Sequence, residues 1–398
     1  MSNQLSKSEF IAMMAMLFAV IAFSIDSMLP ALPRIGQELS PDAPNRAQLI
    51  ITSFVIGMGI ATFFVGSISD AYGRKPLILG GVALYILGAG LAWAAPSLEL
   101  MLLARVVQGI GSSGPRVVAA AIVRDMYAGR EMARIISLVT LVFMLVPAAA
   151  PLLGQGIISV AGWRGIFAAF VIFALVASFW ITFRLPETLR PEARRPVRLT
   201  LMFDGLMQML RHRTVLLSLL AQMGCYAVLF IAISLVQPVF DVVFGRGDQF
   251  PLWFAAMALV GVISSVMNAS LVMRFGMRRL AMTAFGVQVV LASIMSAIWI
   301  SGLRGDAMFH VYFVWQCTLF LQTGFTIGNL NAIAMEPMGH IAGMAASVVG
   351  SVSTLGGALM AVPVVLAFNG TPLPLSIGVG AASAVAWILL MWMRRYEG

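Results

Sequence analysis

The sequence predicts an all-α integral membrane protein whose twelve transmembrane helices form two six-helix bundles. Three observations support this class. Of the 398 residues, 60% are hydrophobic and only 10% are charged, whereas soluble domains carry about a quarter charged residues. The apolar residues form long continuous runs, and a helix needs roughly 20 of them to cross a bilayer. Lys and Arg gather at alternate ends of these runs, as the positive-inside rule requires.

Twelve apolar windows are long enough to be membrane-spanning helices. Lipid offers no hydrogen bonds to the backbone, so helices or closed barrels are needed to span it. The windows are residues 9–30, 47–69, 77–95, 98–124, 133–159, 163–184, 214–238, 250–273, 278–300, 308–333, 342–368 and 372–393. The first window has a signal-like Lys7, but Asp26 and Pro30 follow it and many spans come after, so we expect no cleavage.

The positive charges predict the orientation of the chain. Five of the 25 Lys and Arg fall in the predicted outer loops and two within a span, and the other 18 fall on the inner side. We therefore expect both termini to lie in the cytoplasm. We expect the membrane to be a cell membrane, namely a bacterial inner membrane. The net charge of +9 is then explained by topology and anionic lipid, and it does not indicate a nucleic-acid partner.

The windows divide the chain into three parts. Residues 1–184 form an N-terminal six-helix bundle, residues 185–213 form a cytoplasmic linker with a short amphipathic helix, and residues 214–398 form a C-terminal six-helix bundle. Two six-span halves are typical of transporters built from repeats. The loops DAYGRKPL at 70–77 and MRFGMRRL at 273–280 show a weak internal sequence similarity that supports such a repeat.

The loop after the second span carries the most specific motif. Gly66, Asp70, Gly73, Arg74 and Lys75 follow the pattern G-x-x-x-D-x-x-G-R-K. A small residue allows close helix packing, and glycine permits a tight turn. The segment resembles the loop signature of the major facilitator superfamily, and the alternative is a plain positive-inside loop. We assign these five residues to a conformational motif.

Two further residues are expected to complete this motif. Asp125 lies at the inner end of the fourth span, where it could pair with Arg74. An acid such as Asp70 is favoured at the positive N-terminus of a helix. The family resemblance implies that this helix is the eleventh span, which begins near Gly343.

The fourth span places a row of polar residues inside the membrane. Arg105, Gln108, Ser112 and Arg116 advance by three or four residues, so they share one helix face, which we expect to line the central cavity. A charged residue there needs a partner or water. The segment also resembles the fourth-helix motif R-x-x-Q-G-x-G of the same superfamily. Arg116 either pairs with an acidic or electron-rich substrate or snorkels to the interface.

Asp26 is the acid well inside a predicted span, and we expect it to be the partner of Arg105. Residues 24–33 read SIDSMLPALP and resemble the first-helix signature of drug–proton antiporters. Counted from the span ends, both side chains lie about 12 Å deep. Asp26 and Arg105 are therefore assigned to proton coupling. The alternative is an ordinary polar residue at a helix end that Pro30 disrupts.

The fifth span resembles the antiporter motif of exporting members, which ends G-P-x-x-G-G. Pro151 and Gly154 match this pattern, whereas Ala150 and Gln155 depart from it. Pro147 and Pro151 remove helix hydrogen bonds and can bend the helix. We therefore expect Pro147, Pro151 and Gly154 to form a gating helix that packs against the eighth span, with simple helix packing as the alternative.

The second half lacks an acid deep inside a span. It offers polar groups among many Met and Phe side chains, and Met suits adaptable binding surfaces. We assign Tyr226 and Gln316 to the substrate cavity, together with Gln108, Ser112 and Arg116. Neither a nucleotide-binding loop nor a metal-ligand spacing is visible, so we expect no enzyme activity and no metal. Cys225 and Cys317 lie within predicted spans, and we expect both to act as small buried hydrophobic residues.

Together these motifs resemble the twelve-span drug–proton antiporters of the major facilitator superfamily, with most similarity to the Bcr/CflA-like branch. The resemblance implies a monomer that exports small lipophilic, drug-like molecules by alternating access, with protons as the coupling ion and no cofactor. Two alternatives stay open: a proton-coupled importer or facilitator of a small metabolite, and a membrane sensor without transport. The partial fifth-span motif favours export.

Overall fold

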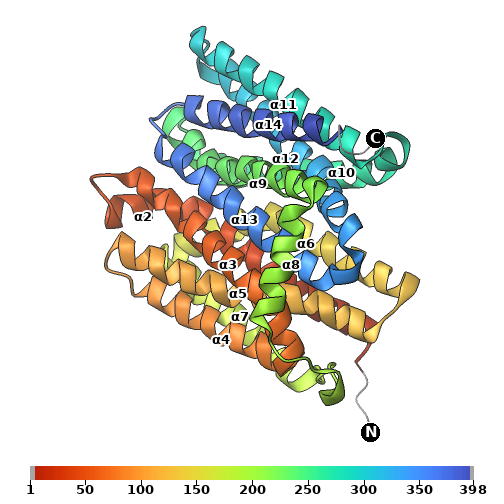
Figure 1. Cartoon of the computed structure of the whole chain (residues 1–398). Helices are drawn as coiled ribbons and strands as arrows, with labels where there is room; N and C mark the ends of the chain where they lie inside the picture. The colour runs from red at the N-terminus through yellow and green to blue at the C-terminus, as the bar shows by residue number, and fades with distance from the viewer. Residues whose placement is uncertain (1–4, 395–398) are drawn as a thin grey trace. The chain divides into compact units, whose positions relative to one another are not determined.

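The computed structural model describes residues 5–394 of the chain. Residues 1–4 and 395–398, which hold the two termini predicted in the cytoplasm, lie outside the described residues. Within the described range every regular element is a helix (Figure 1). Eleven helical segments are long and apolar enough to cross a membrane, and one of them, Gly305–Leu366, contains two long helices joined by a 3₁₀ segment. The predicted class, an all-α membrane protein with twelve long helices, is confirmed.

The helices of the first half follow the predicted windows closely. Ser6 and Ser97 begin two of them with a side-chain oxygen that accepts a backbone N–H of the first turn, which stabilises a helix start. In chain order the elements are α1 (Lys7–Asp26), η1 (Leu29–Ala31), α2 (Leu32–Leu39), η2 (Pro44–Gln48), α3 (Leu49–Tyr72), α4 (Arg74–Trp93), α5 (Leu98–Met126), α6 (Gly129–Ala161), α7 (Arg164–Arg184) and η3 (Pro191–Ala193).

The second half begins with the short helix that the linker sequence predicts. This helix, α8, leaves Leu199, Phe203 and Met207 exposed in one row and buries Met202 and Met209 on another face. In chain order the elements are α8 (Leu199–Arg211), α9 (Arg213–Pro238), the π-helical η4 (Val239–Val243), η5 (Gly247–Gln249), α10 (Phe250–Phe275), α11 (Met277–Ile300), α12 (Gly305–Met335), η6 (Glu336–Ile341), α13 (Ala342–Leu366) and α14 (Leu373–Met393).

The described chain divides into two compact units. The first unit comprises residues 5–40 and 53–199, and the second comprises residues 41–52 and 200–394. The short segment 41–52 therefore belongs to the second unit although it lies early in the sequence. Within that unit the Asn45 side-chain amide donates to the Phe368 carbonyl at 2.6 Å.

The first span differs from its predicted window in one respect. The window runs to residue 30, but α1 ends at Asp26, and the chain continues through η1 into α2. Pro30 is the second residue of η1 and Pro33 the second of α2, and proline is tolerated at a helix start but disrupts a helix interior. The two prolines thus explain why the helix is interrupted beside Asp26.

Glycines bring α5 into backbone contact with two neighbours inside the first unit. A Cβ atom on Gly109 would lie 2.0 Å from the Phe54 carbonyl oxygen of α3, and one on Gly111 would lie 2.4 Å from the Tyr85 nitrogen of α4. Across the first contact, a Cβ atom on Gly57 of α3 would meet the Val106 carbonyl oxygen of α5 at 2.1 Å. Small residues are what allow such close approach between membrane helices.

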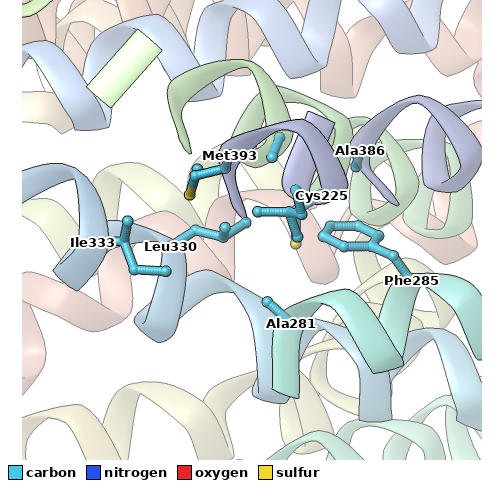
Figure 2. Close-up of a cluster of buried hydrophobic side chains, with 9 residues drawn as sticks. Cys225, Ala281, Phe285, Leu330, Ile333, Ala386 and Met393 are labelled. Carbon is cyan, nitrogen blue, oxygen red and sulfur yellow. The ribbon is translucent and has the colours of Figure 1, made fainter. Parts of the chain in front are cut away.

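The second unit contains a well-defined apolar cluster where four helices converge. Figure 2 shows Cys225 of α9, Phe285 of α11, Leu330 of α12 and Met393 of α14 among the side chains that compose it. The Cys225 thiol lies 2.8 Å from the Thr326 hydroxyl and is buried. This cluster fixes the ends of α11, α12 and α14 relative to one another within the unit.

The glycine contacts of α5 generate a testable prediction. Gly109→Ala should destabilise the protein by about 1–3 kcal/mol, because the added methyl overpacks the contact with α3. Thermal unfolding of the purified protein in detergent measures the change. Gly80→Ala on α4 is the matched control, since nothing lies within 4 Å of its added Cβ. Equal melting temperatures for the two variants would contradict the packing assignment.

Candidate functional site

A buried polar cluster surrounds Arg105 inside the first unit. Arg105 is 0% exposed. Its Nη1 donates to Gln108 Oε1 at 2.7 Å, and its Nη2 donates to the Ser24 carbonyl at 3.0 Å. The guanidinium also lies over the Phe54 ring, 4.4 Å from its centroid, a favourable cation–π distance. The glycine contacts of α5 with α3 and α4 make this enclosure possible.

The same cluster fixes the last turn of α1. The Ser24 and Tyr85 hydroxyl oxygens lie 2.6 Å apart, and both residues are buried. Ser24 thus contacts α4 through its side chain and α5 through its carbonyl. Two helices, α4 and α5, thus hold the backbone position of α1 just before Asp26.

Asp26 is buried but does not form the expected direct pair with Arg105. Its exposure is 4%, and within residues 5–394 no hydrogen bond or ion pair joins its carboxylate to the guanidinium. Arg105 instead binds the carbonyl of Ser24.

The other members of the predicted fourth-span row are placed differently. Gln108 and Ser112 are fully buried, and the Ser112 hydroxyl donates to the Gly109 carbonyl of its own helix at 2.7 Å. Arg116 is partly exposed, and its guanidinium carbon lies 6.0 Å from the Phe143 ring centroid of α6. That these residues line a substrate cavity stays a prediction.

The predicted gating residues lie on α6, beside Asp26. Pro147 and Pro151 are both inside α6, which continues from Gly129 to Ala161. A Cβ atom on Gly154 would lie 2.1 Å from the Ser27 carbonyl oxygen. The glycine of the partial exporter motif therefore allows α6 to pack directly on the backbone next to Asp26. Its predicted contact with the eighth span involves the other unit and stays a prediction.

The loop motif forms a compact ionic network in the first unit. Arg74 Nε donates to Asp125 Oδ2 at 2.9 Å, and Nη1 donates to Asp70 Oδ1 at 2.5 Å. The predicted Arg74–Asp125 pair is thus present, and the Arg74 side chain is only 9% exposed. Gly73 has φ of 107°, a conformation that favours glycine, and Gly66 lies within α3. The contact of Asp70 near Gly343, in the other unit, stays a prediction.

Two residues of the linker complete this network, and sequence reasoning missed both. The Glu187 carboxylate accepts the backbone N–H groups of Arg74 and Lys75, each at 3.0 Å. The Thr188 hydroxyl donates to Asp125 Oδ2 at 3.1 Å. An acid at a helix N-terminus satisfies unpaired N–H groups and complements the helix dipole. The sequence signal was an acid just after a predicted span, opposite a helix start without a capping side chain of its own.

Lys75 ties the loop to the end of α7. Its Nζ donates to the Thr182 carbonyl at 2.7 Å and to the Leu185 carbonyl at 2.9 Å. Carbonyls at a helix C-terminus lack intrahelical partners and attract a cation. The loop motif therefore bonds to a helix start and a helix end simultaneously.

The predicted cavity residues of the second unit lie on α9 and α12. Gln316 is buried, and its Nε2 donates to the Tyr312 hydroxyl at 2.7 Å. Tyr226 is partly buried, and its ring stacks on Phe230 with centroids 5.7 Å apart. Buried Gln222 and Gln237 on α9 each have a side-chain oxygen without a hydrogen-bond partner. The second unit thus offers neutral polar groups, several of them unsatisfied, in an apolar surrounding.

The described residues define the chemistry available to this site. Within residues 5–394 no group of three or more His, Cys, Asp or Glu lies close enough to hold a metal ion. The first unit provides a buried acid and a buried cation, and the second provides amide and phenol groups.

Comparisons with known proteins agree with this geometry. The family model described as Major Facilitator Superfamily matches residues 14–361. A bicyclomycin resistance protein homolog of Haemophilus influenzae is 28% identical over 389 residues, which cover 97% of this chain and 96% of that protein. Multidrug resistance protein MdtL of Shewanella oneidensis is 29% identical over 366 residues, covering 89% of each. A crystal structure of a D-xylose-proton symporter shares the fold at a TM-score of 0.75 and 14% identity, covering 96% of this chain and 97% of that one.

The loop network can be tested with a double-mutant cycle. Arg74→Gln and Asp125→Asn, alone and combined, should give a coupling energy of about 1.5–3 kcal/mol in unfolding by detergent mixtures, as expected for a partly buried charged hydrogen bond. The Lys7–Glu131 pair, whose side chains are 72% and 46% exposed, is the matched control and should couple more weakly, because surface ion pairs contribute little. Absence of coupling between Arg74 and Asp125 would refute the network.

Proposed function

Because the chain belongs to the Major Facilitator Superfamily, we propose that this transporter exports small lipophilic compounds in exchange for protons. The superfamily and the fold predicted from the sequence are confirmed. The relatives named as resistance proteins support drug-like substrates. The proposed location is the bacterial inner membrane, because the matched relatives are bacterial proteins.

The observation that carries the proposal is the buried carboxyl group of Asp26. It is 4% exposed, and it ends a membrane helix whose preceding turn is bonded to Arg105. An ionised carboxylate costs several kcal/mol to bury without a compensating partner, so a group in this position responds to burial by taking up a proton. If the surroundings of Asp26 become hydrated during a transport cycle, the carboxyl group releases a proton, and when water is excluded again it takes one up.

Arg105 gives this carboxyl group a fixed electrostatic environment. Its guanidinium is held by Gln108 and by the Ser24 carbonyl, so its charge stays in place whether or not Asp26 is ionised. We assign Asp26 the role of proton carrier and Arg105 that of a positioning residue for the end of α1. This assignment replaces the direct ion pair expected from the sequence.

The proposed cycle uses alternating access of one binding site. A proton from outside neutralises Asp26 and releases the substrate outward, and the protonated carrier returns and loses its proton inside. Each pH unit supplies about 1.36 kcal/mol per proton, and each 100 mV supplies about 2.3 kcal/mol per charge. One unit and 100 mV together support a concentration ratio of several hundred.

The remaining predicted residues have defined parts in this proposal. Gln108, Ser112, Arg116, Tyr226 and Gln316 would line the substrate path. The loop network around Arg74 would stabilise one conformation of the cycle. The segment of α6 around Gly154, which packs on Ser27, would transmit movement of that helix to the turn that holds Asp26.

Asp26→Asn should slow pH-gradient-driven transport at least tenfold, because an amide cannot carry a proton at neutral pH. A susceptibility panel in a pump-deficient host first identifies a transported compound. Flux of that compound is then measured in liposomes with an imposed pH gradient. Substrate exchange without a gradient should persist in the variant, since exchange needs the binding site but not the proton.

Asp306→Asn is the matched control for this measurement. Asp306 is an acid whose side chain is 83% exposed and pairs with Arg246 at the surface. Its replacement should leave gradient-driven flux within twofold of the wild type. Wild-type flux in Asp26→Asn would remove the proton-carrier assignment, and accumulation of the compound inside cells in place of its extrusion would contradict export.

A further inference from the structure

The short helix α8 of the linker exposes a row of apolar side chains. Leu199, Phe203 and Met207 follow one another at intervals of four residues, which places them on one side of the helix. Their exposed fractions are 52%, 54% and 47%. A helix on the surface of a water-soluble protein turns such a row toward the core, so this row needs an apolar neighbour outside the helix.

A polar row lies beside the apolar one on the exposed surface of α8. Thr200, Asp204 and Gln208 are exposed and each follows an apolar residue by one position, which is about 100° around the helix. Leu201 is also exposed and lies beyond the polar row. An apolar strip beside a polar strip is typical of helices that lie in the plane of a membrane surface.

The buried side of α8 fixes its level along the membrane-spanning helices of the second unit. A Cβ atom on Gly205 would clash with the sulfur of Met344, which lies in the first turn of α13. The Gln208 and His340 side chains lie 2.7 Å apart, and His340 belongs to η6, just before α13. A single residue separates the end of α8 from the start of α9. The helix α8 is therefore at the level where α9 and α13 begin.

The direction of α8 agrees with a position at the membrane surface. Figure 1 shows α8 running across the direction of α9 within the second unit. A membrane-spanning helix such as α9 is tilted on average by about 20° from the bilayer normal, so a helix that crosses it lies closer to the membrane plane. In this position the apolar row can enter the headgroup region while the polar row stays in water.

Basic residues surround the apolar row in the sequence. Residues 190–213 contain six Arg against two acids, Glu192 and Asp204, which gives the segment a net charge of +4. Arg198 directly precedes α8 and Arg211 is its last residue, and both are exposed. Basic residues next to a membrane surface attract anionic lipid. The surface that complements α8 is therefore apolar below and negatively charged above.

From these features we propose that α8 binds the surface of the membrane through anionic phospholipid. Phe203 and Met207 enter the boundary between headgroups and acyl chains, and Arg198 and Arg211 bind lipid phosphates at the two ends of the helix. The polar row faces water. This surface is separate from the proposed transport site, because none of the residues assigned to proton coupling or to the substrate path lies on α8.

Spin labels on α8 of the full-length protein test the position of the two rows. Cys225 is buried and is retained, whereas Cys317→Ala removes the less buried thiol. Phe203→Cys and Met207→Cys carry the label in the apolar row, and Asp204→Cys is the matched control in the polar row. The vesicles contain equal amounts of dioleoyl phosphatidylcholine and dioleoyl phosphatidylglycerol. Oxygen, which enters the bilayer, should relax the apolar-row labels about threefold more than a water-soluble nickel chelate, and the control should show the reverse order.

A second measurement tests the preference for anionic lipid. A fluorophore on Met207→Cys is quenched by nitroxide-bearing phosphatidylglycerol or phosphatidylcholine at the same mole fraction in the vesicles. Phosphatidylglycerol should quench about twofold more strongly. Arg198→Gln/Arg211→Gln should abolish this difference, whereas Arg124→Gln/Arg130→Gln, which removes the same charge from exposed positions of the first unit, should retain it.

Several outcomes would overturn the proposal. Stronger relaxation by the nickel chelate in both rows would place α8 in water. Weak relaxation by both agents at Phe203 and Met207 would show that protein covers the apolar row. Equal quenching by the two lipids when all arginines are present would exclude recognition of anionic lipid, and equal losses in the two arginine pairs would show general electrostatic attraction. The opposite order expected at Asp204 requires a folded helix, so it separates the proposal from damage to the fold.

Discussion

The burial of one guanidinium group constrains the packing of the whole first unit. Arg105 is fully enclosed at membrane depth, where a charge without partners is costly, so the fold must provide Gln108 and the Ser24 carbonyl within hydrogen-bond distance. The bond to Ser24 requires α1 to lie close to α5, and the glycines of α5 allow α3 and α4 to approach the same helix closely. The position of Asp26 follows, because the same bonds hold the turn that precedes it.

Both halves of the chain contain a helix that starts directly after a glycine of positive φ, α4 after Gly73 and α11 after Gly276. A helix that starts after a positive-φ glycine leaves backbone N–H groups and a partial positive charge. In the first half, Glu187 meets both demands from within the chain. In the second half, Arg278 and Arg279 add to the positive charge at the start of α11. The repeat faint in the sequence is therefore clear in the geometry of these two turns.

The sequence predicted those features that the types of the residues alone indicate. Long apolar runs have one structural solution in lipid, and the opposite charges of Arg74 and Asp125 indicated their pairing. It did not predict the Ser24 carbonyl as an acceptor, because every residue has a carbonyl and only the fold selects one. It missed Glu187 because an acid in a charged linker resembles a solvated side chain. The helix end after Asp26 was expected only as the alternative, because prolines can also be accommodated within membrane helices.

The linker has a mechanical consequence beyond its local bonds. Its first part is fastened to the first unit through Glu187 and through the Arg195 N–H, which donates to the Asp70 carbonyl at 3.0 Å. Its last part, α8, is fastened to the second unit, where the Gln208 and His340 side chains lie 2.7 Å apart. The linker segment between Arg195 and the start of α8, which these bonds do not hold, is therefore only a few residues long. Each extended residue spans at most about 3.6 Å. The linker of 29 residues, 185–213, thus acts as a short covalent connection, which gives each unit a high effective concentration with respect to the other.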